Sequence, residues 1–357
     1  MPIFNNLSVN EINGGPAHYV EVGLDEFNSI QCIGASLPDF SGATSIGDCV
    51  FFTAWQSSYL YPNRLPPNTT IDLSNITSYG KYSMGLAFDN NTNLVGKIVI
   101  ADSSVYGSGL QYAFRGTSIT EVEIGQINPA NNAMEGAFKD CLSLTKVTIK
   151  GTRIAAGTAY FNSLFENCPI STLDVSSVVE ISGTSSSTGH TRMFGGLTQL
   201  SEIAWYGLNK INRNALNGMF YGSTIGDMYF PSVTSSSFIH TASLNYMFDG
   251  VTGCTAHFPS NVQATVEAQT GYSTQFGGTN CTVLFDLPAT VTLTGADTKN
   301  YERNPKYDTS TALAWYDTSA TIETPYYTSG TTDPVVGDTI YSDSACTTAV
   351  TTISSIA

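Results

Sequence analysis

A sequence unit recurs seven times between residues 80 and 260. Each copy has a small residue, an aromatic residue, a short gap, an aliphatic residue and then two apolar positions on a strand. The copies lie 24 to 29 residues apart, and a period in this range is typical of a solenoid, where each coil packs only on its neighbours. The aromatic anchors of the copies are Phe88, Phe114, Phe138, Phe165, Phe194, Phe220 and Phe248.

The spacing inside the unit is more regular than the spacing between units. Five consecutive copies carry an aliphatic residue, an apolar residue three positions later and another two positions after that. A step of two is the period of a strand, so both side chains point to one face. The anchors precede this strand in a segment of helical or turn character, and they are expected to be buried in one row. The five triplets are Ile119/Val122/Ile124, Leu144/Val147/Ile149, Ile170/Leu173/Val175, Leu200/Ile203/Trp205 and Ile225/Met228/Phe230.

The outer copies depart from this spacing. The first copy places Ile98 and Ile100 one residue late, and the last places Cys254 and His257 where two apolar side chains are expected. Terminal coils of a solenoid are usually atypical, because they face water or another domain.

The copy from Phe138 to Ile149, with Cys141 and Leu144 between them, resembles one unit of the BspA type of leucine-rich repeat. The resemblance covers about half of the chain and is looser in copies that carry Met before the anchor, as at Met193. It also loosens where Gly and Ser lengthen a connection, as at residues 182–188. The resemblance implies a surface or adhesion role and supplies no catalytic residues.

We therefore expect a mainly β protein with short helices and turns, built as a leucine-rich-repeat solenoid of about seven coils. The expected domains are a β-rich N-terminal domain at 1–80, which could anchor the protein, the solenoid at 81–262 and a β-rich C-terminal module at 263–357. Strands are expected at residues 18–22, 49–55 and 70–73, where apolar residues alternate or run together. The segment 333–343 resembles short C-terminal modules of phage fibre proteins and bacterial surface proteins.

Charge and hydropathy exclude two classes of partner. Charged residues make up 12% of the 357-residue chain, against ~25% in an average protein. The net charge of −15 repels phosphate backbones, so no nucleic-acid partner is expected. No run of about 18 apolar residues is present, so membrane insertion is not expected either.

The seven cysteines form no CxxC pair, which argues against a structural zinc site. Cys141 and Cys168 each lie three residues after an anchor and are expected to stack as core thiols in adjacent coils. A disulfide between them is the alternative. The odd count argues against a complete disulfide framework.

A search for chemistry finds no catalytic motif. None of the four histidines has the spacing of a metal ligand, and His190 lies in a Ser/Gly-rich loop where exposure is expected. Asp227 and Asp249 could serve as a carboxylate pair for sugar hydrolysis, but one is expected on an outward strand position and the other beside an anchor. Residues 89–93 resemble a calcium loop only faintly, and a turn is the simpler interpretation. We expect no enzyme activity, no metal and no cofactor.

The outward face of the repeat strands is the best candidate for binding. It is expected to be mostly acidic, with one aromatic residue near its end. A solvated face without a partner is the alternative. The functional interpretation is contact with a sugar chain or a protein, through Tyr229 stacking and carboxylates that accept hydrogen bonds. The candidate residues are Glu121, Glu123, Lys146, Asp174, Glu202, Asp227 and Tyr229.

The first residues have no cationic start, apolar stretch or cleavage site, so no signal peptide is expected. A surface-type repeat without an export segment favours a bacteriophage virion protein, made in the host cytoplasm and exposed on the particle. Its partners would be other virion proteins and a host-surface glycan or protein, and it could form a homo-oligomer such as a trimer. Two alternatives stay open: a capsid decoration, head-fibre or other structural virion protein, and a bacterial surface adhesin lacking its signal.

Overall fold

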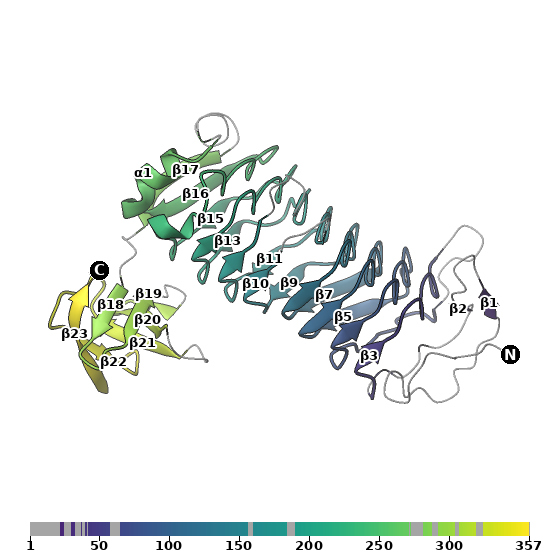
Figure 1. Ribbon diagram of the computed structural model, residues 1–357, viewed down its shortest axis with the longest axis horizontal. Helices are drawn as coiled ribbons and strands as arrows, with labels where there is room; N and C mark the ends of the chain where they lie inside the picture. The colour runs from purple at the N-terminus through teal and green to yellow at the C-terminus, as the bar shows by residue number, and fades with distance from the viewer. Residues whose placement is uncertain are drawn as a thin grey trace.

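The computed structural model describes residues 22–24, 30–32, 37, 40, 42–57, 65–155, 160–183, 190–270, 272, 281–287, 292–303, 307–318 and 324–356. It confirms a mainly β protein built around a solenoid (Figure 1). The coils stack from β3 to β17, and a small barrel of strands β18 to β23 lies beside the C-terminal end of the stack. The short α-helix α1 spans Gln263–Glu267, and no helix of the described residues has the length and hydropathy to cross a membrane.

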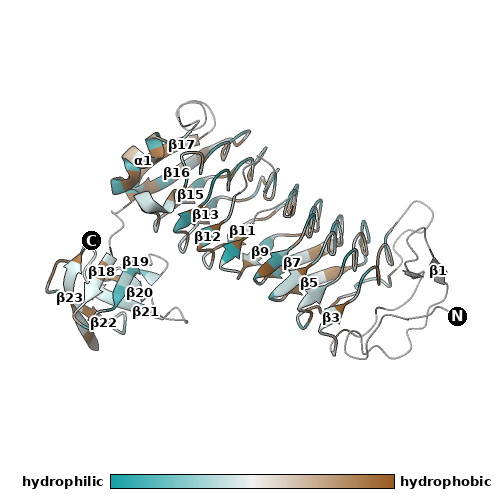
Figure 2. Ribbon diagram, in the orientation of Figure 1, coloured by the Kyte–Doolittle hydropathy of each residue, from teal (hydrophilic) through white to brown (hydrophobic). Residues whose placement is uncertain are grey.

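Two parallel sheets line the first face of the solenoid, because each coil contributes one strand in the same direction. The first sheet has the order β11-β9-β7-β5 and the second β13-β15-β16-β17. Apolar and polar residues alternate along these strands, as the mixed colours of Figure 2 show. The strands are β5 (Val95–Ile100), β7 (Ser118–Ile124), β9 (Lys146–Ile149), β11 (Thr172–Asp174), β13 (Glu202–Ala204), β15 (Asp227–Tyr229), β16 (Cys254–Pro259) and β17 (Cys281–Leu287).

A second face follows after a corner in each coil. Its short parallel strands form two sheets, one in the order β3-β4-β6-β8 and one in the order β10-β12-β14. These strands are β3 (Ser45–Ile46), β4 (Ser78–Tyr79), β6 (Ser103–Val105), β8 (Ile127–Pro129), β10 (Arg153–Ile154), β12 (Glu180–Ile181) and β14 (Lys210–Ile211).

The anchor segments form a third side made of consecutive turns, which agrees with the helical or turn character expected from sequence. Alternate backbone N–H groups reach the next coil: Met84 N donates to Gly109 O at 2.9 Å and Phe88 N to Ala113 O at 2.8 Å. The N–H groups between them close turns within the coil, as Ala87 N does on Met84 O at 2.9 Å. The backbone groups of this side are therefore paired without a helix or a regular strand.

The anchors form a continuous ladder of stacked rings, as the repeat predicts. All seven predicted anchors are buried. Consecutive ring centroids from Phe88 to Phe220 lie 5.2–5.7 Å apart, with interplanar angles of 6–16°. These distances suit offset-stacked aromatic pairs. Each ring thus fixes how deeply the ring of the next coil is buried and how that coil is aligned on its neighbour.

In four coils, the side chain three residues after the anchor bonds to a carbonyl oxygen of the coil before it. Asn91 Nδ2 donates to Trp55 O at 2.9 Å, and Ser223 Oγ donates to Phe194 O at 2.8 Å. The thiols of Cys141 and Cys168 lie 3.1 and 3.0 Å from the carbonyl oxygens of Phe114 and Phe138. Both thiols are free and buried, which confirms the expected core thiols. Burial raises the pKa of the Cys168 thiol, so it remains protonated.

The stack extends beyond the boundaries expected at residues 80 and 262. Residues 49–55, expected as a strand, are a run of turns that bonds to the next coil. Their last residue, Trp55, stacks on Phe88 at 5.1 Å and starts the ladder. Ile71 and Leu73, also expected on a strand, are the buried inward residues of this coil without forming one. At the other end, β17 adds one more parallel strand to β16.

The first and last copies of the repeat are more regular than the sequence suggests. A register shift between Gly96 and Lys97 accommodates the late position of the first copy. In the last copy the buried inward pair is Ala256 and Phe258, and His257 points outward. The expectation that His257 points inward is therefore wrong, because the inward positions are the residues on either side of it.

The flanks of the solenoid are β structure. At the N-terminal end, β1 (Val22–Leu24) pairs antiparallel with β2 (Ile30–Cys32), and the rest of the strand expected at 18–22 lies outside the described residues. Two 3-10 turns, η1 (Ser235–Ser237) and η2 (Ser260–Val262), belong to the last coils. The C-terminal module closes into an antiparallel barrel of β18 (Thr292–Gly295), β19 (Asn300–Arg303), β20 (Ala312–Asp317), β21 (Pro325–Ser329), β22 (Thr339–Tyr341) and β23 (Ala349–Ile356).

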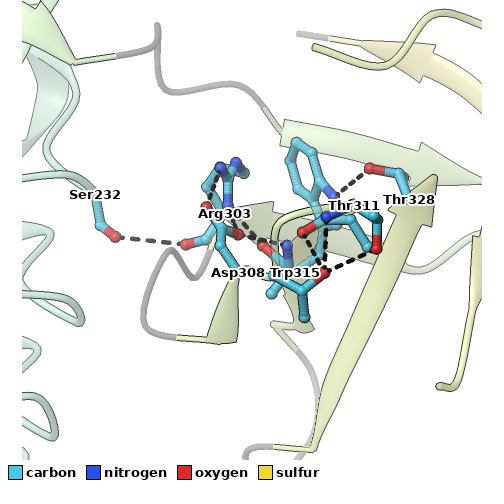
Figure 3. A network of polar contacts seen from close by, with 9 residues as sticks. Ser232, Arg303, Asp308, Thr311, Trp315 and Thr328 are labelled. Carbon is cyan, nitrogen blue, oxygen red and sulfur yellow. Dashed lines mark hydrogen bonds and ion pairs between the residues drawn. The ribbon is translucent and has the colours of Figure 1, made fainter. Parts of the chain in front are cut away.

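An ion pair between a buried arginine and an exposed aspartate organises the solenoid-facing side of the barrel (Figure 3). The Arg303 guanidinium holds both carboxylate oxygens of Asp308 at 2.6 and 2.7 Å and lies over the Trp315 ring. The backbone oxygen of Arg303 accepts a hydrogen bond from Ser232 of the solenoid at 3.5 Å. The barrel thus contacts the solenoid through the main chain of its own buried arginine.

His190 is buried, which corrects the expected exposure. Its Nε2 lies 2.9 Å from the Ser182 carbonyl oxygen and its ring stacks on Phe161. Among the described residues its Nδ1 has no partner. Desolvation lowers the pKa of His190 to about 4, so the side chain is neutral in the folded protein at pH 7.

We predict that Phe138→Ala destabilises the protein by about 3–5 kcal/mol, because it removes a ring that contacts both neighbouring coils. Urea unfolding followed by circular dichroism measures this change. Leu142→Ala is the matched control: Leu142 is 75% exposed and should cost less than about 0.5 kcal/mol. Equal costs for the two variants would contradict the ladder as a source of stability.

We also predict that His190 makes folding sensitive to acid. Its pKa is lower in the folded chain than its ordinary value of 6.5, so the unfolded chain binds the proton first and stability falls as the pH drops from 6.5 to 4. The loss specific to His190 should be about 3 kcal/mol between pH 7 and pH 4. His190→Gln keeps a donor for the Ser182 carbonyl and should remove this part of the pH dependence. Parallel stability curves for wild type and variant would refute the prediction.

Candidate functional site

The predicted binding residues do lie on outward positions of the first face, but they divide between its two sheets. On β7, Val122 and Ile124 point inward and are buried. Glu121 and Glu123 alternate with them along the strand and point to the outer surface. Of the seven predicted residues, four lie on the first sheet and three on the second. Those on the first sheet are Glu121, Glu123, Lys146 and Asp174, and those on the second are Glu202, Asp227 and Tyr229.

Lysine side chains neutralise the two glutamates of the first sheet. Glu121 lies 3.1 Å from the Nζ atoms of both Lys97 and Lys146. Glu123 lies 2.9 Å from Lys97 Nζ and 2.5 Å from Lys150 Nζ. Hydrogen bonds from these lysines lower the pKa of both glutamates. This half of the face is a lattice of alternating charges, and the expectation of a mostly acidic surface is wrong here.

Asp174 has a local role at the end of the same sheet. Its Oδ1 accepts a hydrogen bond from the backbone N–H of Ser176 at 3.0 Å, which fixes the turn after β11. A short polar side chain that bonds two residues ahead is a common turn device. Asp174 is therefore less available for a partner than its exposed position suggests.

The second sheet presents a stacked aromatic pair between two carboxylates. Tyr229 on β15 and His257 on β16 are partners in the strand register, and their rings stack at 4.5 Å with an interplanar angle of 15°. The Nδ1 atom of His257 lies 3.0 Å from Asp286 Oδ1, and its Nε2 lies 3.5 Å from Asp227 Oδ1. The imidazole is thereby held in one orientation on the sheet surface.

Within this group the histidine is nearly buried, whereas the two aspartates are accessible to a ligand. The His257 side chain is 12% exposed, while the Asp227 and Asp286 side chains are 49% and 50% exposed. Burial and then the nearby charge of Asp227 raise the pKa of Tyr229, so its hydroxyl keeps its proton and can donate. Leu284, the register partner of His257 on β17, adds an exposed apolar side chain. No Lys or Arg of the described chain forms an ion pair with these two aspartates.

We call Asp227, Tyr229, His257, Leu284 and Asp286 the second-sheet patch. Sequence reasoning identified Asp227 and Tyr229 and missed the other three residues. The strand register determines their place, since Tyr229, His257 and Leu284 are successive partners across three strands. One sequence feature could have predicted that His257 points outward. Ala256 and Phe258 are two residues apart, as inward residues of a strand are, and His257 lies between them.

The carboxylate pair considered for sugar hydrolysis does not come together in the patch. Asp249, considered with Asp227 as a carboxylate pair, is exposed in a turn on the anchor side and does not belong to the patch. Within the described residues no group of three or more His, Cys, Asp or Glu side chains is arranged to hold a metal ion. Residues 89–93 form a turn in which Asp89 binds both nitrogens of the Arg115 fork at 2.6 and 2.8 Å.

Comparison with known proteins identifies the repeat. The family model described as BspA type leucine-rich repeat region matches residues 57–192 and 110–245, with 6 copies. Together these matches cover more than half of the 357 residues. No curated protein and no solved structure matches the chain.

Proposed function

The chain belongs to the BspA-type leucine-rich-repeat family, and on that premise we propose that it is a non-catalytic binding protein on the surface of a bacteriophage particle. Repeats of this type are generally adhesion or protein-binding modules, and solenoids offer long surfaces for such contacts. We further propose that the second-sheet patch binds a glycan of the host cell surface. The Tyr229–His257 stack, flanked by carboxylates without a lysine or arginine partner, carries this proposal.

The chemistry of the patch favours a sugar over other ligands. The half-buried Tyr229 ring can pack its open part against the apolar face of a sugar ring. Asp227 and Asp286 each keep oxygen atoms that can accept hydrogen bonds from sugar hydroxyls, and charged acceptors form the stronger hydrogen bonds. Asp286 is hydrogen-bonded to His257 Nδ1, so its position is set before a ligand arrives, whereas Asp227 lies 3.5 Å from Nε2 without a hydrogen bond. A fixed site loses less conformational entropy on binding.

The virion location is supported by composition and by the C-terminal module. Few charges and many Ser, Thr, Asn and Tyr residues suit a surface that binds through hydroxyl and amide groups. The segment 333–343, which resembles modules of phage fibres, belongs to the barrel region beside the end of the solenoid.

We predict that Tyr229→Ala weakens binding to host surface polysaccharide about three- to tenfold, the amount expected for one aromatic contact. Tyr246→Ala is the matched control, because Tyr246 is 50% exposed and lies among the turns of the anchor side. Biolayer interferometry on immobilised polysaccharide measures both variants. Equal binding by wild type and Tyr229→Ala would rule out the patch as the glycan site.

Antibodies against the purified protein should label intact phage particles in electron micrographs and block adsorption to the host. Labelling of capsid faces without a block of adsorption would instead support a decoration or head-fibre protein. The absence of any labelled particle would refute the virion proposal.

We also propose a homo-oligomer, with a trimer as the simplest form for a fibre, formed through the flanks of the solenoid. The barrel exposes part of Tyr316, Tyr326 and Tyr327, and such side chains are common in interfaces between subunits. Light scattering at micromolar concentration should give three times the 38.1 kDa chain mass. A monomer both in solution and on the particle would refute this proposal.

A further inference from the structure

The second face of the solenoid is interrupted at one point. Its strands form one sheet that ends at β8 and another that begins at β10, with no strand pairing between them. At this break the side-chain amide of Gln126 replaces a strand. Its Oε1 accepts from the backbone N–H of Arg153 at 3.0 Å, and its Nε2 donates to the carbonyl oxygen of Arg153 at 3.0 Å. Gln126 therefore holds the two coils together where their strands do not pair.

A hollow of about 360 Å³ opens beside this break. Its size lies at the lower end of the ~300–1,000 Å³ range of small-ligand sites. Two tyrosines from different coils line it, together with one arginine, two other polar residues and four small or apolar residues. The residues that matter here are Tyr106, Asn128, Arg153 and Tyr160.

Arg153 is one of three described cations without a carboxylate partner. Nine described Lys and Arg side chains form an ion pair with a carboxylate, whereas Arg153, Lys81 and Arg213 form none within the described residues. The register partner of Arg153 on β12 is Glu180, and their two charges interact without forming an ion pair. That carboxylate already accepts hydrogen bonds from Lys210 and Asn212, both at 3.0 Å. The Arg153 guanidinium thus keeps its donors for an external group.

We propose that this hollow binds a carboxylate-bearing sugar residue, such as a uronic or sialic acid. The guanidinium of Arg153 pairs with the sugar carboxylate in the bidentate geometry that arginine favours. The rings of Tyr106, which is 55% exposed, and Tyr160 pack against the apolar edges of the sugar. The amide of Asn128 bonds its hydroxyls. The site lies on a different face from the second-sheet patch and is independent of it.

The geometry disfavours an acidic peptide as the occupant. A peptide that adds a strand to an open sheet needs free backbone N–H and C=O groups along the edge. At this edge both groups of Arg153 are already bound by Gln126, and Pro129 of β8 has no N–H to offer. A compact ligand that uses side chains alone fits these constraints.

Titration of the full chain with glucuronic acid tests the proposal, with glucose as the neutral comparison and ligand-observed NMR as the readout. We expect glucuronic acid to bind and glucose to bind at least about tenfold more weakly, because a charged hydrogen-bonded pair is lost. Arg153→Gln should weaken glucuronic acid binding to a similar extent. Arg213→Gln is the matched control, since Arg213 is exposed, lies outside the hollow and also forms no ion pair within the described residues.

Three results would overturn the proposal: equal binding of glucose and glucuronic acid, equal losses for the two arginine variants, or no binding of glucuronic acid. Tyr106→Ala should also weaken binding, whereas Tyr229→Ala should leave it unchanged because Tyr229 belongs to the other face. A loss in Tyr229→Ala with retention in Arg153→Gln would assign the acid sugar to the second-sheet patch and refute a site in the hollow. An acidic peptide that displaces glucuronic acid with higher affinity would show that the hollow is built for a peptide.

Discussion

The contact between one coil and the next is the constraint on which the rest of this structure depends. A single coil cannot bury its own apolar side, so it is stable only when another coil covers it. Here three contacts act near the anchor: the stacked rings, the alternate backbone N–H groups and, in four coils, a side-chain donor three residues after the anchor. The donor is Asn, Cys or Ser, each a small group that reaches a carbonyl oxygen of the coil before, whereas Leu197 and Val251 take this position in two other coils. Phe is more strictly needed, since its ring must contact rings on both sides.

The part of the fold that repeats could be predicted from the sequence. The anchors, the inward pairs and the core thiols follow from a period and a fixed internal spacing, and seven copies reinforce one another. The errors occur where a copy stands alone. Trp55 replaces the anchor Phe in the first coil, so the coil was taken for a strand of another domain. His257 was placed one residue out of register because Cys254 fitted the spacing of an inward residue. His190 was judged from its Ser/Gly-rich neighbourhood, whereas the packing of the coils decided its burial.

The candidate site was only partly predictable for a related reason. Outward residues were correctly assigned to the first face, but their partners lie about one coil away in sequence, as Lys97 does from Glu123. Whether a carboxylate is neutralised depends on what the neighbouring coil places beside it, and that requires the register between coils. The same register unites Tyr229, His257 and Leu284, which no local motif connects.

The arrangement separates stability from recognition. Inward residues and turn residues hold the coils together, whereas outward residues can change without disturbing the ladder. On the first sheet the outward residues satisfy one another in a lattice of lysines and glutamates. On the second sheet, and at the break beside Arg153, charged groups keep donors or acceptors that no Lys, Arg, Asp or Glu of the described chain neutralises. On the first face both sheets are built by the same parallel strand pairing, so the difference there comes from the outward side chains. At the second place, the missing strand pairing between β8 and β10 also contributes. These differences are the reason to seek the ligands of this protein at these two places on the solenoid.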